Sequence, residues 1–462
     1  MAKVLEYQAS LSLAGVFAHK FQEVREMNRR SFLKTTGAVT ATSPLLAREL
    51  SISSVGEPDI KHVVVVMMEN RSFDHLLGWL PGSDGKQAGL DYPDKSGVLQ
   101  PTHELAPDYT GCSYPDPDHS YSGGRTEIDA GKMDGFLQPT SNGLNAIGYY
   151  QEKDLPFRSA LARNYTTCDR YFPSMMGPTF PNRIFQHAGA TDRLDDDFSI
   201  CTLPTIWDQL AAQGVSHRYY FSNIPFVALW GLKYVDISAL YANFLADCAA
   251  GTLPAVSFVE PTFTTLDNLD EDDHPFSDVR NGDAFLAKTF KAVATSPNWP
   301  NTVLIVNYDE WGGFYDHVPP PRALAPNNVD PDLVDGKALL GCRVPCIVAS
   351  PWTTGNPDTP RVSHEVFDHT SVLKLIESVW NVPAVAAREM SNDVGNLLDV
   401  LDPANYQPEV PNLPNPGYVI PSSLCLSSTN PSGSSPLTND DEPTVFLKMI
   451  ASGMLKGFPG QS

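Results

Sequence analysis

The chain has 462 residues, of which 42% are hydrophobic and 19% charged, a composition typical of a folded globular protein. Its formal net charge of −22 argues against a nucleic-acid-binding surface, which would be basic, and against tight electrostatic docking on anionic membranes. Its 40 prolines and 32 glycines indicate long, ordered loops, and such loops often carry the functional residues of a rigid scaffold.

The first distinctive segment is Arg29-Arg30-Ser31-Phe32-Leu33-Lys34, followed by small and apolar residues through Ala47. It resembles a bacterial twin-arginine export signal, and we assign residues 1–50 to it, with Met27 as an alternative start. No later stretch approaches the ~20 apolar residues of a membrane span. We therefore expect a periplasmic or secreted protein that uses the twin-arginine export machinery and has at most peripheral membrane contact.

Apolar β-branched runs alternate with amphipathic segments through most of the remaining chain. The predicted strands span residues 62–68, 166–171, 217–221, 255–259, 302–308 and 344–349. The predicted helices span residues 155–162, 206–213, 283–295 and 367–380. This alternation predicts one α/β domain over residues 51–400, with a doubly wound, mixed, mostly parallel central sheet flanked by helices. Residues 401–462 are rich in proline and serine, which predicts a tail that wraps the domain or is partly disordered.

Two of these apolar runs end directly in polar side chains. Glu69 and Asn70 follow the run HVVVVMM, and Asp309 and Glu310 follow the run TVLIVNY. In open α/β sheets, ligands bind beyond the carboxyl ends of the strands. Converging carboxylates repel one another unless a cation lies between them, and their oxygens are hard ligands for a divalent metal. The pattern therefore predicts a metal-assisted hydrolase.

Thr179 follows Gly177-Pro178 and precedes a helical pattern. On local sequence alone it is either a simple helix cap or a nucleophile at the helix amino terminus, where anions bind. A nearby cation would lower the pKa of its hydroxyl, and Arg183, one turn further on, could contact a phosphate oxygen through two hydrogen bonds. The second interpretation gives the helix a catalytic function.

Four histidines each follow an aspartate: His119, His274, His317 and His369. A single Asp-His pair is more often structural than catalytic, but four of them favour a role in phosphate binding or proton transfer near neutral pH.

The seven cysteines contain no CxxC pair, so a cysteine-based zinc site is not indicated. Cys342 and Cys346 are close enough in sequence to bridge, although spacing alone leaves their pairing open.

Together, these segments resemble a bacterial and plant phosphoesterase family that includes non-haemolytic and haemolytic phospholipases C and a respiratory-burst-inhibiting acid phosphatase. The motifs that carry the resemblance are ENRSFDH (69–75), GPTFPNR (177–183), DDHP (272–275), YDEWGGFYDHVPPP (308–321) and DHTSVL (368–373). Five motifs in family order between residues 62 and 380 make a highly specific signal.

The resemblance implies a fold of the alkaline-phosphatase superfamily and a role for each motif residue. Thr179 matches the nucleophile, while His119 and His274 match histidines of the phosphate pocket, and we add His317 as a catalytic residue. The predicted metal ligands are Glu69, Asn70, Asp309 and Glu310. The predicted substrate-binding residues are Asn182, Arg183, Asp273 and His369. The cofactor is expected to be a divalent cation, with calcium, magnesium, manganese and zinc all open.

The resemblance further implies an exported phosphoric-ester hydrolase that acts through a covalent phosphothreonine. A phospholipase C that cleaves phospholipid headgroups is the first expectation, and an acid phosphatase acting on small phosphomonoesters is the alternative. A non-catalytic exported binding protein on the same fold is the alternative of another class. Trp311 stands where several relatives carry histidine or asparagine, and its indole could pack against a choline-like cation.

Overall fold

The computed structural model describes residues 57–264, 270–420 and 442–461. The predicted signal region, residues 1–50, therefore lies outside the described residues. All described residues belong to one compact unit, Val55–Ser462. Within them, no helix is both long enough and apolar enough to cross a membrane.

An eight-stranded sheet forms the centre of this unit, with strand order β14-β6-β13-β10-β1-β9-β7-β8. The strands are β1 His62–Met68, β6 Thr166–Cys168, β7 His217–Phe221, β8 Ser238–Leu240, β9 Val256–Val259, β10 Thr302–Tyr308, β13 Cys346–Ala349 and β14 Val362–Ser363. β13 pairs antiparallel with both of its neighbours, and the other pairings are parallel. The predicted mixed, mostly parallel sheet is confirmed.

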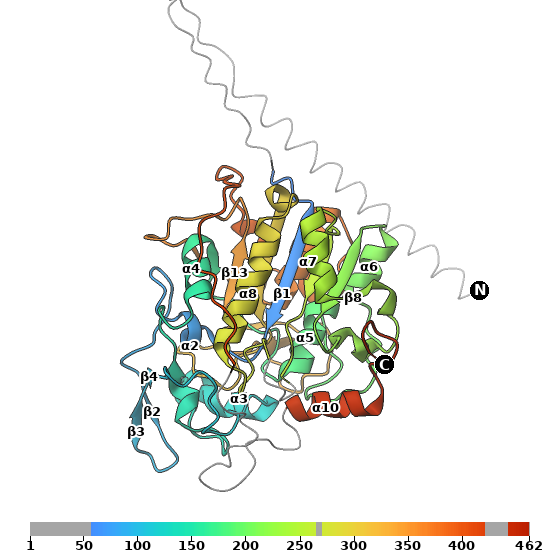
Figure 1. The fold of residues 1–462 in the computed structure, drawn as a ribbon. Coiled ribbons are helices and arrows are strands. Elements are labelled where there is room, and N and C mark those ends of the chain that lie inside the picture. Colours follow the sequence, from blue (N-terminus) through green and yellow to red (C-terminus); the bar gives the residue numbers. More distant parts are fainter. Residues whose placement is uncertain (1–56, 265–269, 421–441, 462) are drawn as a thin grey trace, which may run out of the picture. The chain divides into compact units, whose positions relative to one another are not determined.

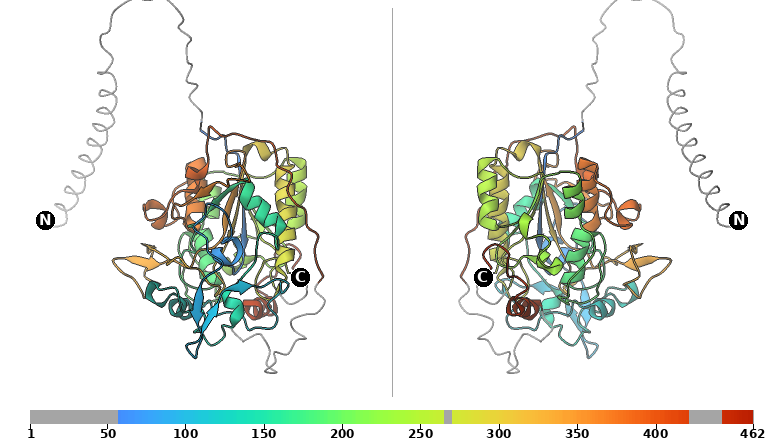
Figure 2. Two further views of the ribbon diagram at one scale, coloured as in Figure 1. Left: turned by 90° about the vertical axis from the view of Figure 1, so that its left-hand side faces the viewer. Right: turned by 90° about the vertical axis from the view of Figure 1, so that its right-hand side faces the viewer.

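The helices that pack on this sheet are α4 Pro156–Asn164, α5 Thr179–Ala188, α6 Ile206–Ala212, α7 Tyr241–Ala250, α8 Val279–Ala294 and α9 His369–Trp380. Figures 1 and 2 show α4, α7 and α8 on one face of the sheet and α5, α6 and α9 on the other. Both faces of the sheet are therefore covered, which explains why β1 and β10 contain unbroken apolar runs, at residues 63–68 and 303–306, instead of alternating.

Smaller elements gather beyond the carboxyl end of β1 (Figure 1). The short helices are α2 Phe73–Leu77 and α3 Tyr121–Ile128. Three two-stranded sheets join β2 Asp91–Pro93 to β3 Leu99–Pro101, β4 His103–Glu104 to β5 Gly148–Tyr149, and β11 Arg322–Leu324 to β12 Lys337–Leu339.

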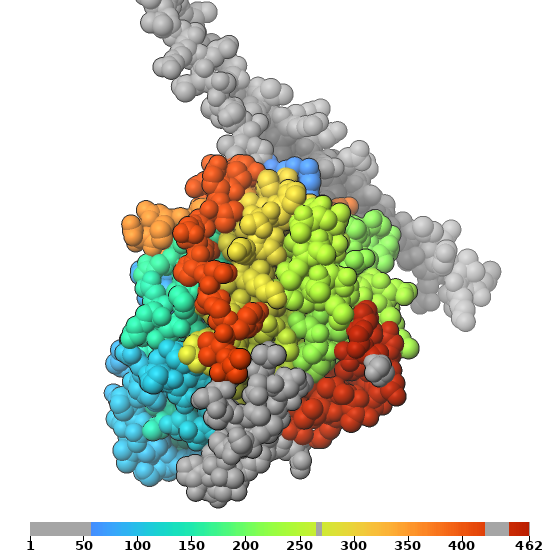
Figure 3. Space-filling model, viewed as in Figure 1, coloured from blue at the N-terminus to red at the C-terminus, as the bar shows by residue number. Residues whose placement is uncertain are grey.

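The structure describes residues 401–420 and 442–461 of the segment predicted as a tail. Residues 402–420 run over α8 (Figure 3), where the Val419 amide donates to Asn281 Oδ1 at 2.7 Å. The helix α10, Glu442–Ser452, lies at the carboxyl end of the sheet, and its Phe446 and Met449 side chains belong to the main hydrophobic core. The sequence pattern did not indicate this helix.

The Cys342–Cys346 bridge, which the sequence left open, does not form. Both side chains are buried free thiols, on the loop before β13 and at the start of β13 itself.

Candidate functional site

The functional side chains begin where the central strands end. Residues Met68 and Tyr308 are register partners on β1 and β10, so Glu69 and Asp309 emerge side by side. The Asp309 amide donates to the Met68 carbonyl at 3.1 Å, and the Asn70 amide donates to Asp309 Oδ1 at 3.1 Å. Asn70 adopts the left-handed conformation (φ 55°), which asparagine tolerates better than most residues. The two predicted acidic clusters therefore form one buried site.

Thr179 joins this site from the opposite side. It is the first residue of α5, and its hydroxyl lies 3.3 Å from Asn70 Oδ1 and also hydrogen-bonds to the Asp309 carboxylate. Asn182 holds the preceding turn, because its Oδ1 accepts from the Met175 amide at 3.1 Å and its Nδ2 donates to the Gly177 carbonyl at 2.8 Å. The predicted nucleophile is thus placed against two predicted metal ligands, and the contacts of Asn182 favour a positioning role over substrate contact.

Arg183 lies one turn further along α5 and is 1% exposed. Its guanidinium makes ion pairs of 2.6 Å with Glu69 Oε1, 2.6 Å with Glu260 Oε2 and 3.2 Å with Asp309 Oδ2. Burial raises the pKa of Asp309, while the positive charge of Arg183 opposes that rise. These contacts favour a role in holding carboxylates together over the expected role in binding phosphate. Glu260, which directly follows β9, was not predicted, although its position after a strand is the same signal that identified Glu69.

Glu310 differs from the acids that Arg183 neutralises. Its Oε2 accepts from the Gly312 amide at 2.7 Å, but its buried Oε1 has no hydrogen-bond partner among the residues that the structure describes. Burial and the neighbouring Asp309 charge raise the pKa of Glu310 well above its ordinary value. A buried carboxylate oxygen without a donor is costly unless it is protonated or bound to a cation.

Asp116, His119 and His274 form a second group next to Asn70, and each offers a ligand atom within 4.8 Å of the others. His119 Nδ1 donates to the Pro117 carbonyl at 2.8 Å, and His274 Nδ1 donates to the Pro275 carbonyl. Because a carbonyl can only accept, each neutral ring carries its lone pair on Nε2. His274 Nε2 lies 3.7 Å from Asp116 Oδ2, and His119 Nε2 lies 3.4 Å from Asn70 Nδ2.

This arrangement suits a cation or a phosphate, since a metal-bound histidine commonly donates its other ring N–H to a carbonyl. Burial and the neighbouring His119 lower the pKa of His274 well below its ordinary value, which keeps the imidazole neutral. Sequence reasoning missed Asp116 because it paired His119 with the adjacent Asp118. The spacing of Asp116, three residues before His119, was the available signal.

His317 belongs to a different cluster. Its Nδ1 lies 2.5 Å from Asp74 Oδ2, and the Arg343 guanidinium contacts Asp74 at 3.2 Å and Asp316 at 2.9 Å. Asp74, Asp316 and His317 also have the spacing of metal ligands, but Arg343 already supplies a positive charge there. The hydrogen bond and negative charge of Asp74 raise the pKa of His317 against the opposing effect of burial. The cluster joins the ENRSFDH and YDHVPPP motifs, and its contacts support a role in positioning these loops.

His369 and Asp273 also contact protein groups. His369 Nε2 donates to the Asp309 carbonyl at 2.7 Å, and its Nδ1 lies 3.1 Å from the Tyr171 hydroxyl. Burial lowers the pKa of His369 to about 4, so the ring is neutral behind Asp309. The Asp273 carboxylate pairs with Arg158 at 2.6 Å and accepts from the Tyr308 hydroxyl at 2.5 Å. The predicted substrate contacts of both residues stay predictions, and the observed contacts are those of supporting residues.

The expected stacking of Trp311 on a choline-like cation is wrong. Its side chain is fully buried, and its Nε1 donates to Glu127 Oε2 at 2.7 Å. Burial raises the pKa of Glu127 to about 8. A buried indole that hydrogen-bonds to an internal carboxyl group is inaccessible to a headgroup.

Sequence comparisons show the family to which the chain belongs. A model of the phosphoesterase family matches residues 60–383, and a model of the twin-arginine translocation signal matches residues 26–43. The chain is 30% identical to non-specific phospholipase C6 of Arabidopsis thaliana over 446 residues, which cover 87% of this chain and 82% of the relative. It is 31% identical to phospholipase C B of Mycobacterium tuberculosis over 473 residues, which cover 84% of this chain and 88% of the relative. The predicted family resemblance and the predicted twin-arginine export are confirmed.

Solved structures that resemble the fold share little sequence with it. A protein in the alkaline phosphatase superfamily from Vibrio parahaemolyticus aligns with a TM-score of 0.37 and 12% identity, covering 75% of this chain and 71% of that one. The phosphonate monoester hydrolase of Agrobacterium radiobacter aligns with a TM-score of 0.34 and 10% identity, covering 74% and 77%. The family assignment follows from the sequence matches.

Proposed function

Because the chain belongs to the phosphoesterase family and is an exported phosphoric-ester hydrolase, we propose that it is a phospholipase C that acts through a phosphothreonine intermediate. The observation that carries the proposal is the position of Thr179. Its hydroxyl lies at the amino terminus of α5, against Asn70 and the Asp309 carboxylate. Helix amino termini stabilise anions, so an incoming phosphoryl group would meet both a nucleophile and a favourable dipole there.

In the proposed reaction, the Thr179 oxygen attacks phosphorus while its proton passes to the adjacent Asp309 carboxylate. The bond between phosphorus and the alcohol oxygen breaks, and that oxygen takes a proton from Nε2 of His119, which enters the reaction as the protonated imidazolium and lies beside Asn70. Water then attacks the phosphothreonine and gives a proton back to His119, and Thr179 recovers its proton as the phosphate ester leaves. With a phospholipid, the products are a diacylglycerol and a phosphorylated headgroup.

The residues present fit a divalent cation. Asn70, Asp309 and Glu310 offer oxygen atoms beside Thr179, and Glu310 Oε1 is buried without a hydrogen-bond donor among the described residues. Oxygen ligands of this kind suit calcium, magnesium or manganese. A cation held there would neutralise phosphoryl charge and lower the pKa of the Thr179 hydroxyl. Of the predicted ligands, Glu69 and Asp309 both pair with Arg183, at 2.6 Å and 3.2 Å, whereas Glu310 does not.

The Asp116, His119 and His274 group is a second donor set, and its two imidazoles suit zinc better than calcium. We assign it to phosphate contact and proton transfer, because His119 is partly exposed and can exchange protons with solvent. The oxygen set contains the uncompensated buried carboxylate, so we assign the cation to that set.

The test is an assay of the purified exported protein on p-nitrophenylphosphorylcholine, p-nitrophenyl phosphate and phosphatidylcholine vesicles, beside Thr179→Ala. We expect turnover of the diester and the lipid, and a loss of several orders of magnitude in Thr179→Ala with the fold retained. Turnover of the monoester alone would show a phosphatase instead, and near-normal turnover in Thr179→Ala would remove Thr179 as the nucleophile.

A further inference from the structure

One carboxylate lies at the amino terminus of α5 without having been predicted for the site. The residue before α5, Pro178, provides no side-chain cap, and the first N–H groups of a helix have no partner within it. Asp196 supplies the missing acceptor from the loop after α5, because its Oδ1 accepts from the Phe180 amide at 2.7 Å. Phe180 is the residue directly after the proposed nucleophile. A carboxyl group therefore occupies part of the anion-binding end of the catalytic helix.

Asp196 is also close to the other acids of the site. Its charge acts on both Asp309 and Glu310, since each carboxylate disfavours ionisation of the next. The nearby cation, Arg193, is engaged elsewhere: its Nε pairs with Asp192 Oδ1 at 2.7 Å and its Nη1 donates to the Asp197 carbonyl. Burial and the charges of Asp309 and Asp195 raise the pKa of Asp196 to about 7, so the carboxylate held on the Phe180 amide is ionised at pH 8.

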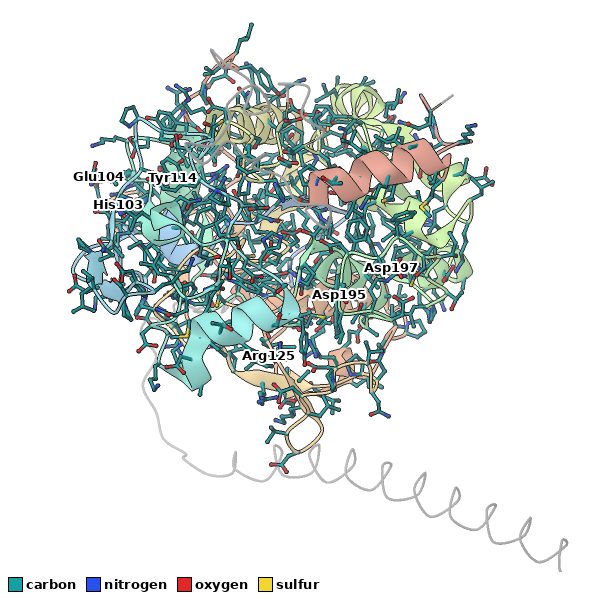
Figure 4. The ribbon with its side chains drawn as sticks, turned by 90° about the horizontal axis from the view of Figure 1, so that it is seen from below. His103, Glu104, Tyr114, Arg125, Asp195 and Asp197 are labelled. Atoms are coloured by element: carbon teal, nitrogen blue, oxygen red, sulfur yellow. The ribbon has the colours of Figure 1, made fainter. Side chains whose placement is uncertain are left out.

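The loop holds Asp196 in this position. The Asp197 carboxylate accepts from the amide and the hydroxyl of Ser199 at 3.0 Å and 2.9 Å, and the Thr191 hydroxyl donates to the Arg193 carbonyl at 3.1 Å. Figure 4 shows the two flanking residues, Asp195 and Asp197, on the face that closes the carboxyl end of the sheet. Asp195 is exposed, whereas Asp196 is partly buried against the start of α5.

We propose that Asp196 determines substrate specificity: its carboxylate, held on the Phe180 amide beside Thr179, selects phosphate esters with one negative charge over esters with two. The inference rests on the proposed function, because it places the phosphoryl group at Thr179. A phosphodiester carries one charge on phosphorus, and a phosphomonoester carries nearly two above its second pKa of about 6. Repulsion from a fixed carboxylate grows with each added charge and is strong where water is partly excluded.

The experiment compares kcat/KM for p-nitrophenylphosphorylcholine and p-nitrophenyl phosphate at pH 8 in the wild type, Asp196→Asn and Asp195→Asn. Asparagine keeps an oxygen that can accept from Phe180, so the helix cap survives. We expect Asp196→Asn to raise the monoester-to-diester ratio by about 10-fold or more. Asp195→Asn, which removes the same charge from an exposed neighbour, should leave the ratio near the wild-type value. The inhibition constant of inorganic phosphate should fall by a similar factor in Asp196→Asn alone.

An unchanged ratio in Asp196→Asn, or an equal change in Asp195→Asn, would overturn the proposal. Asp196→Ser, which also keeps a neutral acceptor, replaces Asp196→Asn if that variant does not fold. If a folded neutral variant lost all turnover, inorganic phosphate binding would decide: tighter binding supports the proposal and unchanged binding refutes it. The proposed function fails separately, if Thr179→Ala retains activity or if the wild type hydrolyses the monoester alone.

Discussion

At the scale of single residues, Arg183 is the clearest case of a motif residue with an unexpected set of contacts. A buried guanidinium between Glu69, Glu260 and Asp309 balances charges that could not otherwise remain ionised in one place. Arginine suits this position because its planar, forked donors reach several carboxylates at once, which a lysine ammonium cannot do in the same geometry. We infer that Arg183 positions the acids around Thr179.

Arg183→Ala should therefore lower the free energy of unfolding as well as activity. Removing one partner of a buried ion pair costs about 3–5 kcal/mol, because the remaining charges stay buried and uncompensated. Urea unfolding measures this loss, and Arg183→Lys should recover only part of it. An unchanged stability with a raised KM would instead support the phosphate-binding role expected from the sequence.

A substitution of Glu310 tests whether this residue is a ligand of the proposed cation. Glu310→Gln keeps the size of the side chain and removes its charge, so it should lower the bound metal content of the purified protein several-fold, measured by elemental analysis. His274→Gln, the comparison variant in the imidazole group, should keep its metal while losing activity. If Glu310→Gln kept its metal and His274→Gln lost it, the cation would instead be assigned to Asp116, His119 and His274.

At the scale of secondary-structure elements, the start of α5 is supported by a side chain of α5 itself, by the loop that follows it and by the carboxyl-terminal helix. The first turn of α5 receives the Asp196 cap, its preceding loop is held by Asn182, and Phe180 packs against α10. The Phe446 ring of α10 lies 5.6 Å from the Phe180 ring and 5.0 Å from the Phe263 ring, measured between centroids. The carboxyl-terminal helix therefore supports the start of the catalytic helix.

Phe446→Ala tests this support. The side chain is 1% exposed, and truncating a buried phenylalanine costs about 3–5 kcal/mol in unfolding free energy. The adjacent Leu447 is 41% exposed, so Leu447→Ala should change stability by only about 0.5 kcal/mol or less. Equal effects of the two substitutions in thermal unfolding would contradict the packing of α10 on the core.

At the scale of the whole molecule, the charge balance predicts how stability depends on pH. Burial raises the pKa of Glu127 and of Glu389 to about 8, and Asp74 raises the pKa of His317. In each case the folded protein binds a proton more tightly than the unfolded chain does. The stability that comes from this tighter proton binding is present at low pH and is lost as pH rises through the pKa values of the folded protein. The contribution of these three groups to the free energy of unfolding should therefore fall between about pH 5 and pH 8.

Urea unfolding of the wild type at pH 5.5 and pH 8 measures this fall. Glu389→Gln should reduce the fall in unfolding free energy by about 1 kcal/mol per pH unit, because the variant lacks one carboxyl group whose pKa is raised by folding. Glu389 is a suitable position because it lies outside the candidate site, on the segment after α9. An equal pH dependence of stability in the variant and the wild type, or a steeper fall in the variant, would contradict the raised pKa of Glu389.

The sequence alone determined the fold class, the export route and the central part of the site. These were predictable because they depend on local features: β-branched runs buried on both faces of a sheet, acids placed directly after strands, and a threonine at a helix start. Parallel strands bring such ends together wherever they occur in the chain, so Asn70 and Asp309 meet although 239 positions separate them.

Only the tertiary structure decided which charged groups pair. Neighbours in sequence point in different directions, so His119 faces Asp116 and Asn70, and His317 pairs with Asp74 instead of Asp316. Asp196 reaches the start of the catalytic helix only because the chain folds back after α5. Such partners are selected by the packing of distant segments, and the electrostatic energy of a buried charge depends on the same packing. A local sequence pattern contains no information about either.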